Sequence, residues 1–319
     1  MFRRVAPVLV TLACLSTGAQ AQPASLFRAY LSATGSDANP CTLAAPCRLL
    51  PAALNAVASG GEIWMLDSAN YNTGTVTIGK SVSILSVPGA QGSIVLNNGH
   101  AIVVSASGLS VALRNVAVVP VVGAGTAGQF GLHLIGNSTV TLDRCLFAGL
   151  PDDAIRMTEG RLLLTDSMVR DSKDGWAVNV TSNSGAYASI SHSRLLSNAE
   201  GGVRFSSAGG ETQGTVSDSV IVGRAGGTSR GIHAVTSALY AVAVVGVTRT
   251  KIEATAEAIS TSTGQQLGYA EVTVGGSMLV SNGVGFQNTA GGSIYSLRDN
   301  ILYRNGLNNG GPIQTMSPL

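Results

Sequence analysis

The chain has 319 residues, of which 40 are glycine, and only 11% of its residues are charged, against roughly 25% in an average globular domain. This composition argues against a bundle of helices and favours many short strands joined by tight turns. The chain has 19 basic and 17 acidic residues, and loss of a leader that contains Arg3 and Arg4 would leave 17 of each. A neutral chain without a basic run is not expected to bind nucleic acid.

The first 21 residues have the features of a signal peptide. Arg3 and Arg4 precede an apolar stretch over residues 5–15, and the Ala-Gln-Ala at 19–21 is a suitable cleavage site. We therefore expect a secreted or periplasmic protein. A lipoprotein signal ending at Cys14 is the alternative. Beyond the leader no apolar run approaches the ~18 residues that span a bilayer, so no membrane span is expected.

Residues 22–99 are predicted to form an N-terminal cap and the first coils of a repeat. Cys41 and Cys47 flank a loop with two prolines, and in an exported chain they are predicted to form a disulfide, with two free thiols as the alternative. Apolar residues at helical spacing between Leu49 and Val57 predict one short amphipathic helix that covers the open end. Alternating strands are expected at 62–66, 75–78, 81–85 and 93–96.

A repeat runs through residues 100–307. The pattern small, apolar, any residue, apolar begins at positions 101, 131, 154, 177, 202, 231, 258 and 285, so its starts lie 23 to 30 residues apart. This period predicts the coil of a β-solenoid with three short strands. The tail at 308–319, rich in glycine, proline and asparagine, is expected to be loose.

A second marker lies midway through each coil, where a small polar residue is followed two places later by an apolar or small one. The markers are Asn115, Cys145, Ser167, Ser193, Ser219, Thr250, Ser277 and Asn300. Stacked about 4.8 Å apart, they would form an internal hydrogen-bonded ladder. Cys145 is therefore predicted to be a small buried member of that ladder and not a nucleophile.

With these repeats, the sequence resembles the pectin lyase-like superfamily, and in particular exported bacterial β-helix repeat proteins. The residues that carry the resemblance are the repeats and the opening segments GSDANPC at 35–41, PC at 46–47 and GGEI at 60–63. The resemblance implies a right-handed parallel β-helix that binds an elongated polysaccharide along one face. The Arg-x-Pro triplet of pectate lyases is absent, and Asp152-Asp153 matches the Asp-Asp of polygalacturonases without their Gly-His-Gly and Arg-Ile-Lys motifs. Fold alone does not determine activity.

The third residue of each repeat pattern, between the two apolar ones, is expected to point outward, because alternate residues of a strand face opposite sides. His133 and His233 would then be separated by four strand steps, roughly 19 Å. Guanidinium groups can pair with sugar carboxylates or sulfates, and amides with hydroxyls. The expected outward column is Val103, His133, Arg156, Asn179, Arg204, His233, Ser260 and Gln287. Acids in the turns before these strands would line its border: Asp152, Asp153, Asp174, Glu200 and Glu257.

The predicted function is binding of an extracellular or envelope polysaccharide, acidic if the arginines take part. The candidate ligand-binding residues are His133, Arg156, Asn179, Arg204, His233, Asp152 and Asp153. A lyase or glycoside hydrolase that uses Arg156, Arg204 and the acidic border is one alternative, and a structural or adhesive module is another. A strand face that is polar only because it is solvated would give the same column.

No cofactor motif is present, and no metal site is predicted. His100 and His192 are expected to be isolated, and His133 and His233 to be separated by three coils. Calcium binding and the oligomeric state stay open at this point.

Overall fold

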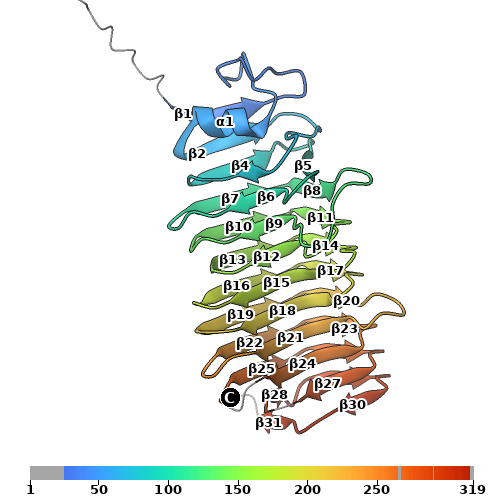
Figure 1. Ribbon diagram of the computed structural model, residues 1–319. Coiled ribbons are helices and arrows are strands. Elements are labelled where there is room, and N and C mark those ends of the chain that lie inside the picture. Colours follow the sequence, from blue (N-terminus) through green and yellow to red (C-terminus); the bar gives the residue numbers. More distant parts are fainter. Residues whose placement is uncertain (1–24, 265–266, 290, 317–319) are drawn as a thin grey trace, which may run out of the picture.

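The computed structural model describes residues 25–264, 267–289 and 291–316 and confirms the predicted fold, an all-β, right-handed parallel β-helix (Figure 1). Each strand pairs in parallel with its counterpart one coil later, so three sheets run along the solenoid. The predicted leader lies outside the described residues, and the predicted segment boundaries stay predictions. In the segment 308–319, the structure has a strand at Gln314–Met316, which pairs with Ser293–Leu297.

The described strands belong to sheets that we call A, B and C. Sheet A contains β1 Leu26–Leu31, β2 Val57–Met65, β4 Val82–Ser86, β7 Ser110–Arg114, β10 Thr139–Asp143, β13 Gly160–Thr165, β16 Ala186–Ser191, β19 Glu211–Ser217, β22 Val242–Thr248, β25 Tyr269–Gly275, β28 Ser293–Leu297 and β31 Gln314–Met316. Sheet B contains β5 Gly92–Leu96, β8 Val116–Pro120, β11 Leu146–Ala148, β14 Met168–Arg170, β17 Arg194–Leu196, β20 Val220–Val222, β23 Lys251–Glu253, β26 Met278–Val280 and β29 Ile301–Tyr303. Sheet C contains β3 Val76–Thr77, β6 Ile102–Val104, β9 Leu132–Leu134, β12 Ile155–Met157, β15 Trp176–Ser182, β18 Gly201–Ser207, β21 Arg230–Thr236, β24 Glu257–Thr263, β27 Val284–Asn288 and β30 Leu307–Asn309.

One short helix, α1 Leu50–Ala56, packs at the N-terminal end of the solenoid against β1 and β2 (Figure 1). Its buried residues Leu50, Ala53 and Leu54 form one face, as the helical spacing predicts. The predicted disulfide between Cys41 and Cys47 is confirmed in the loop before α1, with the two Cα atoms 4.6 Å apart. Among the described residues, no helix is long and apolar enough to cross a membrane.

The core is a stack of apolar side chains that point into the solenoid from all three sheets. In sheet A the register places one inward residue from each coil above the next, and strand alternation keeps the intervening residues outside. The buried stack in this sheet includes Ile63, Ile84, Leu113, Leu142, Leu164, Ile190, Val216, Val247 and Val274.

The predicted internal ladder follows the corner between sheets A and B. Ser167 Oγ accepts the Cys145 N–H at 3.0 Å, and Ser193 Oγ accepts the Ser167 N–H at 3.2 Å. Cys145 is a free thiol, 2% exposed, and burial raises its pKa to about 11, so it is a structural member of the ladder. The placement of Asn115 was wrong by one residue, because the register pairs Ala117 with Leu146 and so aligns Val116 with Cys145.

Candidate functional site

The outward side chains of the sheet C strands form the column that the repeat pattern predicts. The pairing of β9, β12, β15, β18, β21 and β24 places one residue of each strand in the same register. We call this set the middle column: His133, Arg156, Asn179, Arg204, His233 and Ser260.

The middle column is less exposed than the alternation predicts. Arg156 and Arg204 are partly exposed, but Asn179, His233 and Ser260 are only 2%, 9% and 2% exposed. The prediction of an exposed position is therefore wrong for these three residues. The physical reason is that side chains from a neighbouring register position reach two of them, since Asp153 bonds Asn179 and the Trp176 ring stacks on His233, while Ser260 lies against His233.

That neighbouring position immediately precedes the small residue of each repeat. We call it the flanking column, and the described register places Trp176, Gly201, Arg230 and Glu257 beside one another. The complete set is His100, Phe130, Asp153, Trp176, Gly201, Arg230 and Glu257. From the sequence only Asp153 and Glu257 were expected at this face, and His100 was expected to be isolated, although the fixed place of this position in the repeat is a signal that could have identified the whole set.

Asp153 is the buried acid of the site, at 1% exposure. Its carboxylate accepts hydrogen bonds from Arg156 Nη1 at 2.8 Å, Asn179 Nδ2 at 2.9 Å and the Trp176 N–H at 2.8 Å. Burial raises the pKa of Asp153, and the bond from Arg156 opposes that rise. Asp153 therefore positions Arg156 and Asn179, and does not line an exposed acidic border.

Asp152 has a different role from its neighbour. Its Oδ2 accepts the Gly128 N–H at 2.6 Å, and its Oδ1 accepts the Asp153 N–H at 2.8 Å. Asp152 thus holds the loop over 121–131 against the start of β12, away from the middle column.

Arg204 is the unpaired cation of the site. Arg156 is paired with an acid three residues earlier, whereas the residue three before Arg204 is Gly201, where an added Cβ would lie 1.9 Å from the Arg230 carbonyl oxygen. Within the described part of the chain, the Arg204 side chain has no ion pair or hydrogen bond, and its Nε is buried without a partner. Burial, and then the charge of Arg156, lowers the pKa of Arg204.

Trp176 and His233 cover the floor of the site beside Arg204. Their rings stack with centroids 6.3 Å apart and an angle of 12° between the planes, so the indole reaches past Gly201. His233 Nδ1 lies 2.8 Å from Ser260 Oγ. Burial, together with Arg230 and Arg204, lowers the pKa of His233 to about 4, so the ring is neutral near pH 7.

His100, Phe130 and His133 form an aromatic cluster at the other end of the site. His100 stacks on Phe130 at 4.9 Å, and His133 lies edge-on to both rings. His100 Nδ1 accepts the Phe130 N–H at 3.0 Å, so the neutral ring carries its proton on Nε2 and donates to His133 Nδ1 at 3.3 Å. Burial lowers the pKa of His133 to about 4, and this tautomer leaves its Nε2–H as a donor. The prediction that His100 is isolated was wrong, because it precedes its strand at the same position as Phe130 does one coil later.

Two longer loops lie at the ends of this face. Residues 121–131 connect β8 to β9 and residues 223–229 connect β20 to β21, whereas the three connections between them have four to six residues. Figure 1 shows both loops projecting from the same side of the solenoid, next to β8 and β20. The part of the face between these two loops has shorter connections, and it contains Arg156, Asn179 and Arg204.

The described residues contain no group of three or more histidine, cysteine or acidic side chains placed to hold a metal ion. His133 and His233 lie on strands separated by β12, β15 and β18, as the repeat spacing predicts.

Two solved structures share this fold. The chain is similar to pectate lyase Pel9A, with a TM-score of 0.56 and 14% identity over 91% of this chain and 78% of that one. It is also similar to GH136 lacto-N-biosidase from Eubacterium ramulus, with a TM-score of 0.52 and 11% identity over 91% of this chain and 68% of that one. These likenesses show the pectin lyase-like parallel β-helix fold alone. No protein-family model and no curated protein matches the sequence.

Proposed function

We propose that the outward face of sheet C binds an anionic polysaccharide outside the cytoplasm. The observation that carries this proposal is Arg204, a partly buried guanidinium without an acidic partner among the described residues. A charge in such a place is costly unless an anion from outside pairs with it. A sugar carboxylate offers two oxygens that match the guanidinium fork.

The spacing of the two arginines suits a polymer better than a single small anion. Arg156 and Arg204 are two strand steps apart, roughly 10 Å along the solenoid. Asn179, which is buried and bonded to Asp153, lies between them, and the His133 Nε2–H extends the same strip. Repeated anionic units could therefore meet both cations, while the His133 Nε2–H could donate to a sugar hydroxyl.

The similar structures and the disulfide support this proposal. One of the two similar proteins is a pectate lyase by name, and pectate is an anionic polysaccharide. The Cys41–Cys47 disulfide fits an oxidising compartment, as the predicted leader does.

Affinity electrophoresis in gels that contain polygalacturonate tests the proposal. The protein should be retarded, and Arg204→Ala should abolish most of the retardation while keeping the circular dichroism spectrum. Arg194→Ala is the matched control, because Arg194 is an exposed arginine on β17 of sheet B and its loss removes the same charge from another face. Equal retardation of all three proteins would reject the proposed site, and no retardation of the parent would favour a purely structural module.

Cleavage of the same polymer is the second candidate function. It is favoured by the lowered pKa of Arg204, which makes this side chain a better proton acceptor than an exposed arginine. In a β-elimination, Arg204 would first lose a proton to solvent, the neutral guanidine would take the proton from the carbon beside the uronate carboxyl, the electron pair would form a double bond, and the glycosidic oxygen would leave with a proton from water. Hydrolysis is less favoured, because Asp153 and Glu257 are already paired with Arg156 and Arg230.

The size distribution of polygalacturonate after incubation, with and without calcium, separates the two candidates. Shortened chains with unsaturated ends would establish a lyase. Unchanged chains that still retard the protein would establish binding alone.

A further inference from the structure

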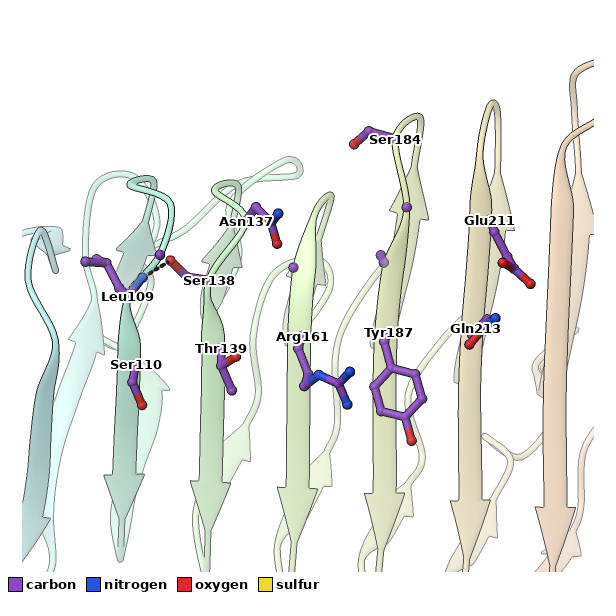
Figure 2. A pocket seen from close by; sticks show the side chains of 14 residues that line it. Leu109, Ser110, Asn137, Ser138, Thr139, Arg161, Ser184, Tyr187, Glu211 and Gln213 are labelled. Carbon is purple, nitrogen blue, oxygen red and sulfur yellow. Dashed lines mark hydrogen bonds between the residues drawn. The ribbon is translucent and has the colours of Figure 1, made fainter.

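A groove of about 780 Å³ lies over the outward face of sheet A, away from the middle and flanking columns. Figure 2 shows side chains from β7, β10, β13, β16 and β19 along it. The register places Thr139, Arg161, Tyr187 and Gln213 in one row across four neighbouring strands.

The groove arises from the lengths of the turns between sheets C and A. The turn from β12 to β13 has only residues 158–159, whereas the turns on either side span 135–138 and 183–185. Gly160 allows the short turn, because it has a φ of +85° and an added Cβ would lie 2.3 Å from the Ser138 carbonyl oxygen. The turns between sheets C and A form one wall of the groove, and this wall is therefore lower at β13 than at the neighbouring strands.

A pair of packed side chains, Arg161 and Tyr187, lies at the centre of the groove. The Arg161 guanidinium carbon lies 4.4 Å from the centroid of the Tyr187 ring, so the two side chains pack together in a cation–π contact. Tyr187 combines an apolar ring with a hydroxyl at low cost in side-chain entropy, which suits it to the mixed apolar and polar surface of a sugar.

The side chains around this pair are polar, and several of them can form hydrogen bonds to a ligand. Asn137, Glu211 and Gln213 are exposed, and in the described part of the chain their side chains form no hydrogen bond. Glu159 accepts a hydrogen bond from Ser184 Oγ at 2.9 Å beside the groove. The local charge is one arginine against two glutamates, which disfavours an anionic ligand and separates this groove from the face with Arg156 and Arg204.

We propose that this groove is a second glycan site that binds a neutral oligosaccharide, with one sugar ring against Tyr187 and hydroxyls paired with Gln213, Glu211 and Asn137. The site is independent of the anion-binding face proposed on sheet C. A polymer that carries both kinds of unit could meet the two faces of one solenoid, and separate polymers could be bridged by it.

A glycan array that carries both neutral and uronate oligosaccharides tests the proposal, with fluorescently labelled parent and variants. At least one neutral oligosaccharide should bind, and Tyr187→Ala should weaken it about tenfold, as loss of one aromatic contact does. Gln213→Ala, an exposed change that leaves the core untouched, should weaken the same glycan. Tyr295→Ala, which removes an outward tyrosine from β28 of the same sheet, is the matched control and should bind normally.

This experiment tests the two proposed sites independently. Arg204→Ala should lose only uronate glycans, and Tyr187→Ala only neutral ones. The second site is wrong if the parent binds no neutral glycan, or if Tyr187→Ala and Gln213→Ala both bind as the parent does.

Discussion

At the scale of single residues, the position three before each arginine of the middle column sets its role. Arg156 has Asp153 there, buried and 2.8 Å from its guanidinium, so removal of Arg156 would leave a carboxylate buried without its main partner. Arg204 has Gly201 there, and in the described chain its guanidinium pairs with no acid and forms no hydrogen bond. Arg156 therefore supports the fold as well as the proposed site, whereas Arg204 serves the site alone.

This difference predicts that Arg204→Met stabilises the protein. Methionine keeps the apolar stem and removes an unpaired, partly buried charge, so the free energy of unfolding should rise by about 1 kcal/mol while polygalacturonate binding is lost. Urea unfolding followed by tryptophan fluorescence measures the first effect and affinity electrophoresis the second. A less stable Arg204→Met protein would show that this arginine supports the structure.

His233 predicts how stability depends on pH. Burial lowers its pKa to about 4, whereas the unfolded chain titrates near 6.5. Protons therefore bind the unfolded state more readily in this window, so the contribution is fully present above about pH 6.5 and is lost as the pH falls towards 4. It is about 3 kcal/mol at most.

His233→Gln should flatten the dependence of unfolding free energy on pH between about 6.5 and 4, measured by urea titrations. His133 and Asp153 remain in both proteins, and Asp153 acts in the opposite direction, because its pKa is raised and its ionisation lowers stability as the pH rises. The difference between parent and variant isolates His233. Parallel pH profiles would contradict the buried, neutral state of this ring.

At the scale of the strand corner, the turn from sheet A to sheet B repeats a two-residue device. A residue with positive φ, such as Asp166 at 49° or His192 at 50°, is followed by a ladder residue. Ser193 Oγ donates to the Ser191 carbonyl oxygen at 2.8 Å and accepts the Ser167 N–H from the previous coil. The ladder therefore bonds each corner internally and to its neighbour.

Ser193→Leu should lower the free energy of unfolding by about 3 kcal/mol, because the larger side chain over-packs the corner and both bonds are lost. Ser189→Leu on the outward face of β16, the strand that leads into this corner, is the control, and should change stability little. Urea unfolding compares the two. Equal stabilities would mean that the ladder is not a packed part of the core.

At the scale of the whole molecule, the period of the sequence predicted the register of the strands, but it did not predict side-chain packing or the length of individual turns. Coil length and strand alternation fix which residues share a register, so the middle column follows from them. The direction that a side chain takes over its neighbours does not follow from them. Trp176 reaches past a glycine to stack on His233, and Asp153 turns towards Asn179 and bonds it. The groove on sheet A depends on the length of one turn between β12 and β13, which the pattern leaves free.

The proposed anion-binding face on sheet C also has a definite length. From His133 to His233 it spans four strand steps, roughly 19 Å, between the two longer loops at 121–131 and 223–229. A bound polymer should therefore gain contacts up to this length and little beyond it.

Isothermal titration calorimetry with galacturonate oligomers of increasing length tests this account most directly. It predicts that affinity rises with each added unit until the oligomer covers the face from His133 to His233 and then levels off, and that Arg204→Ala loses the rise. Oligomers that bind no more tightly than the monomer, or that bind the parent and Arg204→Ala equally well, would contradict it.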